Sequence, residues 1–512
     1  MREQLLLLPG YLTAHLQLSL AALCASALLA IPLGITVHRR PALEPALLGA
    51  ASAIQTIPGL ALLAVMVPLF AGVGALLAGG GISVRGIGAW PALVALTLYG
   101  LLPIVRNTVT GLAGVDPAVR EAARGVGMTP TEELWRVELP LALPVIIAGV
   151  RTAAVWIVGT ATLATPIGAT SLGNYIFSGL ATRNNAAVLV GCLAAAALAL
   201  GLDQLIRMLE AGIRARRRAW WGAAVALLGA LALYAGATAA IRAGRTAPAI
   251  AIGAKPFTEQ YVLAEILRQQ IEARTGIATR GVPSLGSTVA FDALSAGDLD
   301  AYVDYSGTIW ATIMHRGDPG ERRGALLAEV EQFLAREHGI AVAGALGFEN
   351  SYALAMRADR ARELGLSRIS DLARRAPELE IGGDYEFFAR AEWRALVAAY
   401  GLAFRAQRAM DPSLLYTAVR ERQVDAISAY STDGRIAALG LTVLDDDRRV
   451  IPPYDAIVLA SARLAHEHPE VIAALRELAG AIDAAAMRRM NAAVDADGRS
   501  PADVAREFLE RK

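Results

Sequence analysis

Residues 121–140 read EAARGVGMTPTEELWRVELP, a polar stretch between two long apolar runs. A short helix is predicted over 116–126, followed by a turn at Gly127, because glycine adopts turn conformations at little steric cost. A second helix is predicted over 129–135, since its first residue is a threonine, a good N-cap, and a proline follows it. Leu139 and Pro140 are expected to end that helix. The stretch alone indicates a helical hairpin between two membrane spans.

Long apolar runs lie on both sides of this hairpin. The chain has 512 residues, of which 55% are hydrophobic and 19% charged, against roughly 25% charged in soluble domains. A bilayer span needs about 20 apolar residues. The predicted spans are 14–37, 51–71, 90–111, 144–165, 186–206 and 219–241. The second is followed by a Gly-rich segment, 72–88, expected to be a loop or a re-entrant piece.

Arginines set the orientation of these spans. They cluster after the first span, in or beside the link between the third and fourth spans, and after the fifth span, at Arg39 and Arg40, at Arg106, Arg120, Arg124 and Arg136, and at Arg207, Arg214, Arg216, Arg217 and Arg218. Basic residues are retained on the cytoplasmic side of a membrane. We therefore expect a multi-pass protein of the cell (inner) membrane whose N-terminus and residues after 242 lie outside the cytoplasm.

Residues 248–512 have a different composition and predict an α/β domain. Strand-like runs alternate with helical patterns, which is typical of α/β lobes with mostly parallel sheets. The runs are 249–254, 300–304, 340–345, 352–357, 379–382, 424–428 and 455–460. This length suits two lobes with a ligand between them, the second lobe occupying about 356–452. The predicted fold is an all-α transmembrane domain of about six helices fused to a two-lobed α/β domain.

Several function classes are disfavoured. A net charge of +1 gives no field for nucleic acid. The chain has no GxxxxGK[ST] loop, so it lacks the usual nucleotide phosphate site. The histidines after residue 248 share no ligand spacing, and we expect no metal site. No Ser/His/Asp or paired-carboxylate arrangement stands out, which disfavours an enzyme.

The stretch 121–140 resembles the coupling loop of ATP-binding cassette (ABC) importer permeases. That loop has EAA, three residues, Gly, nine residues, Ile, one residue and Leu-Pro; Val137 here replaces the Ile. The matching residues are Glu121, Ala122, Ala123, Gly127, Leu139 and Pro140. The resemblance implies that the loop 119–144 transmits force from a separate cytoplasmic ABC ATPase dimer. ATP is then used by that partner, this chain holds no cofactor, and a second copy completes a permease homodimer.

Five motifs after residue 248 resemble the binding proteins of the osmoprotectant importer family. They are GAKPFTEQ (253–260), DYSGT (304–308), GFENSYALAM (347–356), DYEFFAR (384–390) and AYSTDGRI (429–436), with a weaker IPPYDAIVL at 451–459. Some members of that family fuse both parts in this order. The resemblance implies a permease at 1–213, a basic link with a last transmembrane helix as tether at 214–247, and a periplasmic-binding-protein-like, extracytoplasmic domain at 248–512.

The resemblance also implies a solute site. A quaternary ammonium has no N–H to donate and is best held by aromatic faces. The cage carried over from the family is Tyr305, Tyr352, Tyr430 and Tyr454, and the donors for a carboxylate are Lys255, Arg390 and Thr308. Glu386 would orient Arg390 at the i, i+4 spacing. Asn350 aligns where some relatives carry an acid.

Other residues near these motifs are assigned to structure. Asp433 and Arg435 are expected to brace the loop after Tyr430. Phe257, Phe387 and Phe388 are assigned to the lobe core, with Phe387 also a candidate cage wall. Tyr302 and Tyr385 are undecided, because neighbours in β-runs point to opposite faces.

The function implied is ATP-driven import of glycine betaine or a related quaternary ammonium osmoprotectant. The partners implied are a small zwitterionic or cationic solute, membrane lipid, the ATPase dimer and a second copy, with no nucleic acid. A nearer alternative is another trimethylammonium solute such as ergothioneine or choline. A second alternative is a membrane-tethered solute sensor, against which the intact coupling motif speaks.

Overall fold

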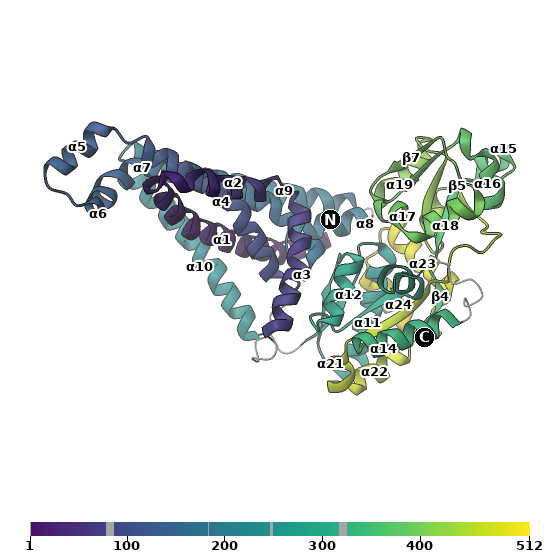
Figure 1. Ribbon diagram of the computed structural model, residues 1–512. Coiled ribbons are helices and arrows are strands. Elements are labelled where there is room, and N and C mark those ends of the chain that lie inside the picture. The colour runs from purple at the N-terminus through teal and green to yellow at the C-terminus, as the bar shows by residue number, and fades with distance from the viewer. Residues whose placement is uncertain (1, 78–85, 183, 246–248, 317–324) are drawn as a thin grey trace. The chain divides into compact units, whose positions relative to one another are not determined.

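The computed structural model describes all residues except 1, 78–85, 183, 246–248 and 317–324 (Figure 1). The chain divides into two compact units, Met1–Phe177 with Ala186–Thr246, and Ser178–Asn185 with Ala247–Lys512. The first is helical and the second is built on two β-sheets. The division agrees with the change in composition near residue 248. Residues 246 and 247 of the predicted tether lie outside the described residues.

Five long apolar helices confirm five of the six predicted spans. They are α1 (Arg2–Arg39), α4 (Ala89–Ala113), α7 (Leu139–Ala161), α9 (Asn185–Arg214) and α10 (Arg218–Arg245). Shorter segments are η1 (Pro41–Leu43), η4 (Thr162–Ile167) and α8 (Gly173–Ala181), the last of which is divided between the two units at Ser178.

The predicted second span, 51–71, is wrong as a single straight helix. α2 (Glu44–Thr56) and α3 (Gly59–Leu77) meet there at an angle of 100°. The cause is Pro58, since the residue before a proline is disfavoured in a helix. Ile57 is accordingly extended, at φ −68° and ψ 126°. The pair forms a broken span or a re-entrant loop, and residues 78–85 of the Gly-rich segment 72–88 lie outside the described residues.

Glycines allow the central helices of this unit to approach closely. α4 packs against both α1 and α7. A Cβ on Gly149 of α7 would lie 2.6 Å from the Asn107 Cβ and 2.8 Å from the Pro103 carbonyl oxygen of α4. Small residues at such contacts permit the backbone-to-backbone packing by which helices associate in a membrane.

The predicted hairpin is present and projects from one end of the helical unit (Figure 1). It consists of α5 (Pro117–Gly125) and α6 (Pro130–Glu133), with Gly127 at φ +84° between them. Thr129 and Glu132 form a capping box at the start of α6. Arg124 of α5 donates two hydrogen bonds to the buried Glu133, at 3.0 and 3.1 Å, which ties the two helices together.

The predicted end of this hairpin at Leu139 and Pro140 is wrong. A π-helical turn, η3 (Leu134–Glu138), connects α6 to α7 without a break in the helical path. Pro140 then lies in the first turn of α7, where the N–H that proline lacks would have no partner within that turn, so little hydrogen bonding is lost. The coupling stretch is therefore continuous with a long membrane helix.

The second unit contains two five-stranded sheets, one in each lobe. The order is β2-β1-β3-β10-β4 in the first lobe and β7-β6-β8-β5-β9 in the second. The strands are β1 (Ile250–Gly253), β2 (Thr279–Val282), β3 (Ala301–Tyr305), β4 (Ala341–Glu349), β5 (Tyr352–Arg357), β6 (Glu380–Gly383), β7 (Ala406–Ala409), β8 (Ala426–Tyr430), β9 (Leu441–Leu444) and β10 (Asp455–Ala460).

The sheets are mixed, which corrects the expectation of mostly parallel pairing. β10 runs antiparallel to β3 and β4, and β5 runs antiparallel to β8 and β9. The reason is connectivity: the chain enters the second lobe through β5 and returns to the first through β10. These two strands therefore run against the others in their sheets. The expected lobe boundary at 356 falls inside β5.

Helices cover both sheets (Figure 1). Those of the first lobe are α11 (Thr258–Thr275), α12 (Ser287–Ser295), α13 (Ser306–Thr308), η5 (Ile309–Ile313), α14 (Leu326–His338), α21 (Ala462–Glu467), α22 (Pro469–Arg476), α23 (Ala484–Asp495) and α24 (Pro501–Arg511). Those of the second are α15 (Ala358–Leu364), α16 (Ile369–Arg375), η7 (Ala376–Glu378), α17 (Tyr385–Ala389), α18 (Ala391–Tyr400), α19 (Pro412–Arg420) and α20 (Arg435–Ala438).

Candidate functional site

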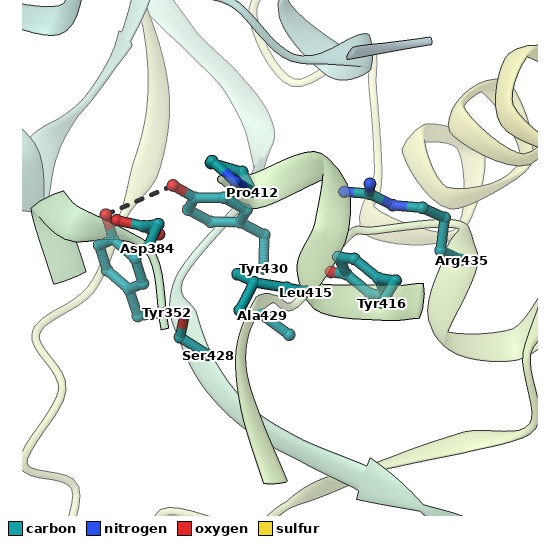
Figure 2. Close-up of a pocket in the computed structure, with 9 residues that line it drawn as sticks. All are labelled: Tyr352, Asp384, Pro412, Leu415, Tyr416, Ser428, Ala429, Tyr430 and Arg435. Atoms are coloured by element: carbon teal, nitrogen blue, oxygen red, sulfur yellow. Dashed lines mark hydrogen bonds between the residues drawn. The ribbon is translucent and has the colours of Figure 1, made fainter. Parts of the chain in front are cut away.

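Two tyrosines face each other where the sheet of the second lobe meets the first lobe. Tyr352 begins β5, Tyr430 ends β8, and the antiparallel register of these strands pairs them directly. Their ring centroids are 5.0 Å apart and the Tyr430 hydroxyl lies 3.3 Å from the Tyr352 hydroxyl. Figure 2 shows both hydroxyls directed to one point beside Asp384. Burial raises the pKa of all three groups, so the phenols stay protonated at neutral pH.

Phe257 joins this pair to the first lobe. Its ring stacks on Tyr430 at 5.6 Å and 13°, and on Tyr305 at 6.3 Å and 25°. Tyr305 ends β3 and Phe257 precedes α11, so both belong to the first lobe. Phe257 packs against the lobe core, as expected, and it also lies between tyrosines of the two lobes. The sequence feature that could have indicated this position is the place of Phe257 inside the motif GAKPFTEQ.

The fourth predicted tyrosine completes the cluster. Tyr454 lies just before β10 and meets Tyr352 edge-on, at 6.0 Å and 84°. Phe387 of α17 is fully buried and lies 5.2 Å from Tyr352, as expected for a wall residue. The structure thus brings together all four predicted cage tyrosines. We call Phe257, Tyr305, Tyr352, Tyr430 and Tyr454 the aromatic cluster.

Arg390 lies at one side of this cluster. Its guanidinium is 5.1 Å from the Tyr352 ring and pairs with Glu386, the predicted i, i+4 partner. It also lies 3.5 Å from Glu392, which accepts a hydrogen bond from the Tyr454 hydroxyl. Glu392 was missed, because only the helix that follows Arg390 brings it back toward the cluster.

Lys255 forms an ion pair inside the first lobe. Its ammonium lies 2.5 Å from the Asp304 carboxylate, and both side chains are buried. The Tyr302 hydroxyl donates to the same carboxylate at 2.6 Å, which places Tyr302 in this cluster of charges rather than in the cage. Thr308 is buried in α13. The roles of Lys255 and Thr308 as carboxylate donors stay predictions.

A second buried carboxylate, Glu259 of α11, was also missed. It is 3% exposed and accepts from the Tyr305 hydroxyl at 2.6 Å, from the Asn350 amide at 2.8 Å and from the Asn491 amide at 3.1 Å. The Thr432 hydroxyl is a fourth donor. Burial raises the pKa of Glu259 against these donors. Glu259 lies within the motif GAKPFTEQ and is bonded to Asn350, the residue that aligns where some relatives carry an acid.

Two further expectations have clear outcomes. Asp433 and Arg435 pair at 2.9 and 3.0 Å after Tyr430, which confirms that they brace that loop. Tyr385 is 69% exposed and lies outside the aromatic cluster. In the hairpin, Ala123 is buried, Leu139 is half-buried, and Glu121, Ala122, Gly127 and Pro140 are exposed.

Comparison with known proteins matches both units. Residues 248–511 match the substrate binding domain of the ABC-type glycine betaine transport system, and residues 26–215 match the binding-protein-dependent transport system inner membrane component. The chain is 31% identical over 472 residues to the ergothioneine transport permease/ergothioneine binding protein EgtU of Helicobacter pylori (strain G27), covering 90% of this chain and 82% of that protein.

The chain belongs to the ABC-type osmoprotectant importers with fused permease and substrate-binding domains.

Single-domain members of this importer family match each unit separately. The carnitine transport binding protein OpuCC of Listeria monocytogenes is 33% identical over 272 residues, covering 52% of this chain and 88% of that protein. The choline transport system permease protein OpuBB of Bacillus subtilis (strain 168) is 40% identical over 196 residues, covering 38% and 83%. The crystal structure of a glycine betaine/carnitine/choline ABC transporter is 32% identical, with a TM-score of 0.45, and covers 51% and 98%.

Family membership defines the general role of the chain. It is a membrane protein that combines the permease and the binding component of an ABC importer. Such an importer works with an ATPase and a small solute, and its permease and binding components serve transport rather than covalent chemistry. The aromatic cluster then lies in the domain that recognises the solute.

Proposed function

We propose that this importer carries glycine betaine or a related quaternary ammonium solute, held by the cage Tyr305, Tyr352, Tyr430 and Tyr454 together with Phe257. One observation carries the proposal: the rings of both lobes meet in one buried cluster. A cation over a desolvated aromatic face gains about 2 kcal/mol or more. A trimethylammonium group suits such faces because it has no N–H that would remain unpaired.

Binding requires the lobes to open and close. A group between two ring faces needs roughly 7 Å, twice the contact distance of carbon atoms. Phe257 and Tyr430 are 5.6 Å apart, so the solute enters only when these rings separate. Two crossings join the lobes, before β5 and before β10, and they can act as the hinge.

Charged groups beside the cage suit the carboxylate of a betaine. Arg390 is held against the cage ring of Tyr352 and offers planar N–H donors, while Glu386 and Glu392 orient it. Thr308 and Lys255 are the further donors. Asn350 has no carboxylate, and its amide instead donates a hydrogen bond to the carboxylate of Glu259.

The assembly proposed is a homodimer of this chain in the membrane, with its lipid, on a separate ABC ATPase dimer. The ATPase engages the loop 119–144 through the exposed residues of α5 and α6, and it supplies the nucleotide site. The domain at 248–512 is extracytoplasmic, consistent with the arginine-rich links on the other side. The tether 214–247 keeps the binding domain near its permease at an effective concentration of roughly millimolar.

Choline and ergothioneine form the second candidate class. The name of the 31% identical relative, an ergothioneine transport permease and binding protein, favours the latter. The sensor alternative is disfavoured by the ordered hairpin, in which Arg124 and Glu133 tie together two helices that a sensor would not need.

The experiment is a calorimetric titration of the full chain in lipid nanodiscs with glycine betaine, choline and ergothioneine. Glycine, which lacks the three methyl groups, is the matched control. Micromolar binding of one quaternary compound with no binding of glycine is the expected result. Failure of the folded chain to bind any of them would overturn the proposal.

A further inference from the structure

A polar recess adjoins the aromatic cluster. It begins at the faces of Phe257 and Tyr430 and ends at Glu259, Asn350 and Asn491. We call these last three residues the acceptor recess. They come from α11, the crossing before β5, and α23, three segments far apart in the sequence. The recess is therefore built by the fold rather than by one loop.

Two acceptors in this recess lack donors. The side-chain oxygens of Asn350 and Asn491 are buried and have no hydrogen-bond partner among the residues that the structure describes. Their orientation is fixed, because the amide nitrogen of each donates to Glu259. A buried acceptor without a donor is costly. These two oxygens therefore point to a donor that the folded chain does not itself supply.

The charges around the recess also favour a hydrogen-bond donor. The hydrogen bonds that reach Glu259 come from neutral groups, those of Tyr305, Thr432 and the two asparagines. Asp495 also lines this space, where it accepts from Thr258, while Asp433 and Arg435 neutralise each other. The recess presents acceptors and negative charge next to the rings.

Resting on the proposed function, we infer that the acceptor recess is a second subsite that takes N–H donors carried by the solute beyond its trimethylammonium group. Glycine betaine has no N–H and would leave these acceptors to water. A trimethylammonium compound with a nitrogen heterocycle, of the type of ergothioneine, can place its ammonium on the rings and its ring N–H toward the two amide oxygens, since Glu259 already accepts four hydrogen bonds. The recess then selects among quaternary solutes that the cage alone would treat alike.

The test compares ergothioneine with glycine betaine on the full chain in nanodiscs by calorimetry. In Asn491→Leu the affinity for ergothioneine should fall about five- to tenfold, as expected for loss of one neutral hydrogen bond. The affinity for glycine betaine should change by less than about threefold. Asp300→Asn is the matched control, a buried acid of the same lobe bonded to the Ala251 N–H and to Arg463, outside the recess.

A second variant covers the case in which Asn491→Leu binds neither solute. Asn350→Leu removes the other unpartnered oxygen while keeping Glu259, and it should also weaken ergothioneine binding selectively. Equal changes for both solutes in this variant, or unchanged ergothioneine affinity in both variants, would overturn the subsite and leave the proposed function standing. If the unaltered chain binds no quaternary ammonium compound, the proposed function itself fails, and the subsite with it.

Discussion

The ammonium of Lys255 and the carboxylate of Asp304 form an ion pair of 2.5 Å inside the first lobe. Asp304 lies next to Tyr305 on β3 and also accepts from the Tyr305 backbone N–H at 2.8 Å. The Lys255 ammonium is 5.8 Å from the Tyr305 ring. The pair thus fixes the strand end that presents one wall of the cage, whatever Lys255 contributes to the solute.

Lys255→Met should destabilise the binding domain. Removing one partner leaves the Asp304 carboxylate buried and uncompensated, which costs roughly 3–5 kcal/mol. The double variant with Asp304→Asn should recover part of that loss. Chemical unfolding of the full chain in detergent measures both. Unchanged stability together with lost betaine affinity would instead assign Lys255 to the solute.

Tyr430→Ala should weaken binding of quaternary ammonium solutes about thirtyfold, the equivalent of about 2 kcal/mol for one desolvated aromatic face. Tyr430→Phe keeps the ring and should stay within a few-fold of the unaltered chain. Tyr385→Ala, at an exposed tyrosine outside the cluster, is the remote control. Calorimetry reports all three affinities, and equal affinity of the Ala and Phe variants would argue against the cage.

Gly127→Ala should reduce uptake without changing solute affinity. Gly127 has φ +84°, a conformation that costs a residue with a Cβ roughly 1–2 kcal/mol. Gly125 lies two residues earlier with equally open surroundings and no positive φ. Gly125→Ala should therefore transport normally. Uptake and ATP hydrolysis of the two variants are compared in proteoliposomes that contain the partner ATPase. Normal uptake by Gly127→Ala would contradict the coupling role.

Gly149→Ala should lower the thermal stability of the permease. Its Cβ would meet the α4 backbone at the Pro103 carbonyl oxygen, 2.8 Å away. Gly159 lies on the same helix with nothing within 4 Å, so Gly159→Ala should be neutral or slightly stabilising. The unfolding midpoints in detergent are compared, and two equal midpoints would show that α4 and α7 are not so closely packed.

Glu259 should make stability depend on pH in a defined direction. Its pKa is raised by burial, so the folded chain holds this proton more tightly than the unfolded one. The resulting stability is present below the unfolded pKa of about 4.3 and is lost as pH rises through the folded pKa. The unaltered chain should therefore lose stability relative to Glu259→Gln as the pH rises above about 4.3. A pH-independent difference between the two would contradict the raised pKa.

Hydropathy and short motifs were sufficient for much of the fold. They predicted five membrane helices, the hairpin and most strands, because each depends on local composition. They missed the bend at Pro58, since the apolar run continues through it. They also missed β2, β7 and β9, which are edge strands with exposed or half-exposed residues and no continuous apolar run.

The candidate site was predictable to the extent that single motifs contain it. The four cage tyrosines are each inside a motif, and the structure places them together. Glu259 and Glu392 could not be assigned to the site, because their contacts with Asn491 and Tyr454 join segments separated by 232 and 62 residues. Whether Lys255 is paired or free likewise depends on Asp304, 49 residues away.

The division of the aromatic cluster between the lobes has a kinetic consequence. When the lobes separate, Phe257 and Tyr305 move with the first lobe, and Tyr352 and Tyr430 move with the second. An opened domain would therefore keep only part of the proposed cage, and the residence time of the solute would be governed by the rate at which the lobes part. A permease that pulls the lobes apart would thereby release the solute, and it would not need a higher affinity for the solute than the binding domain has.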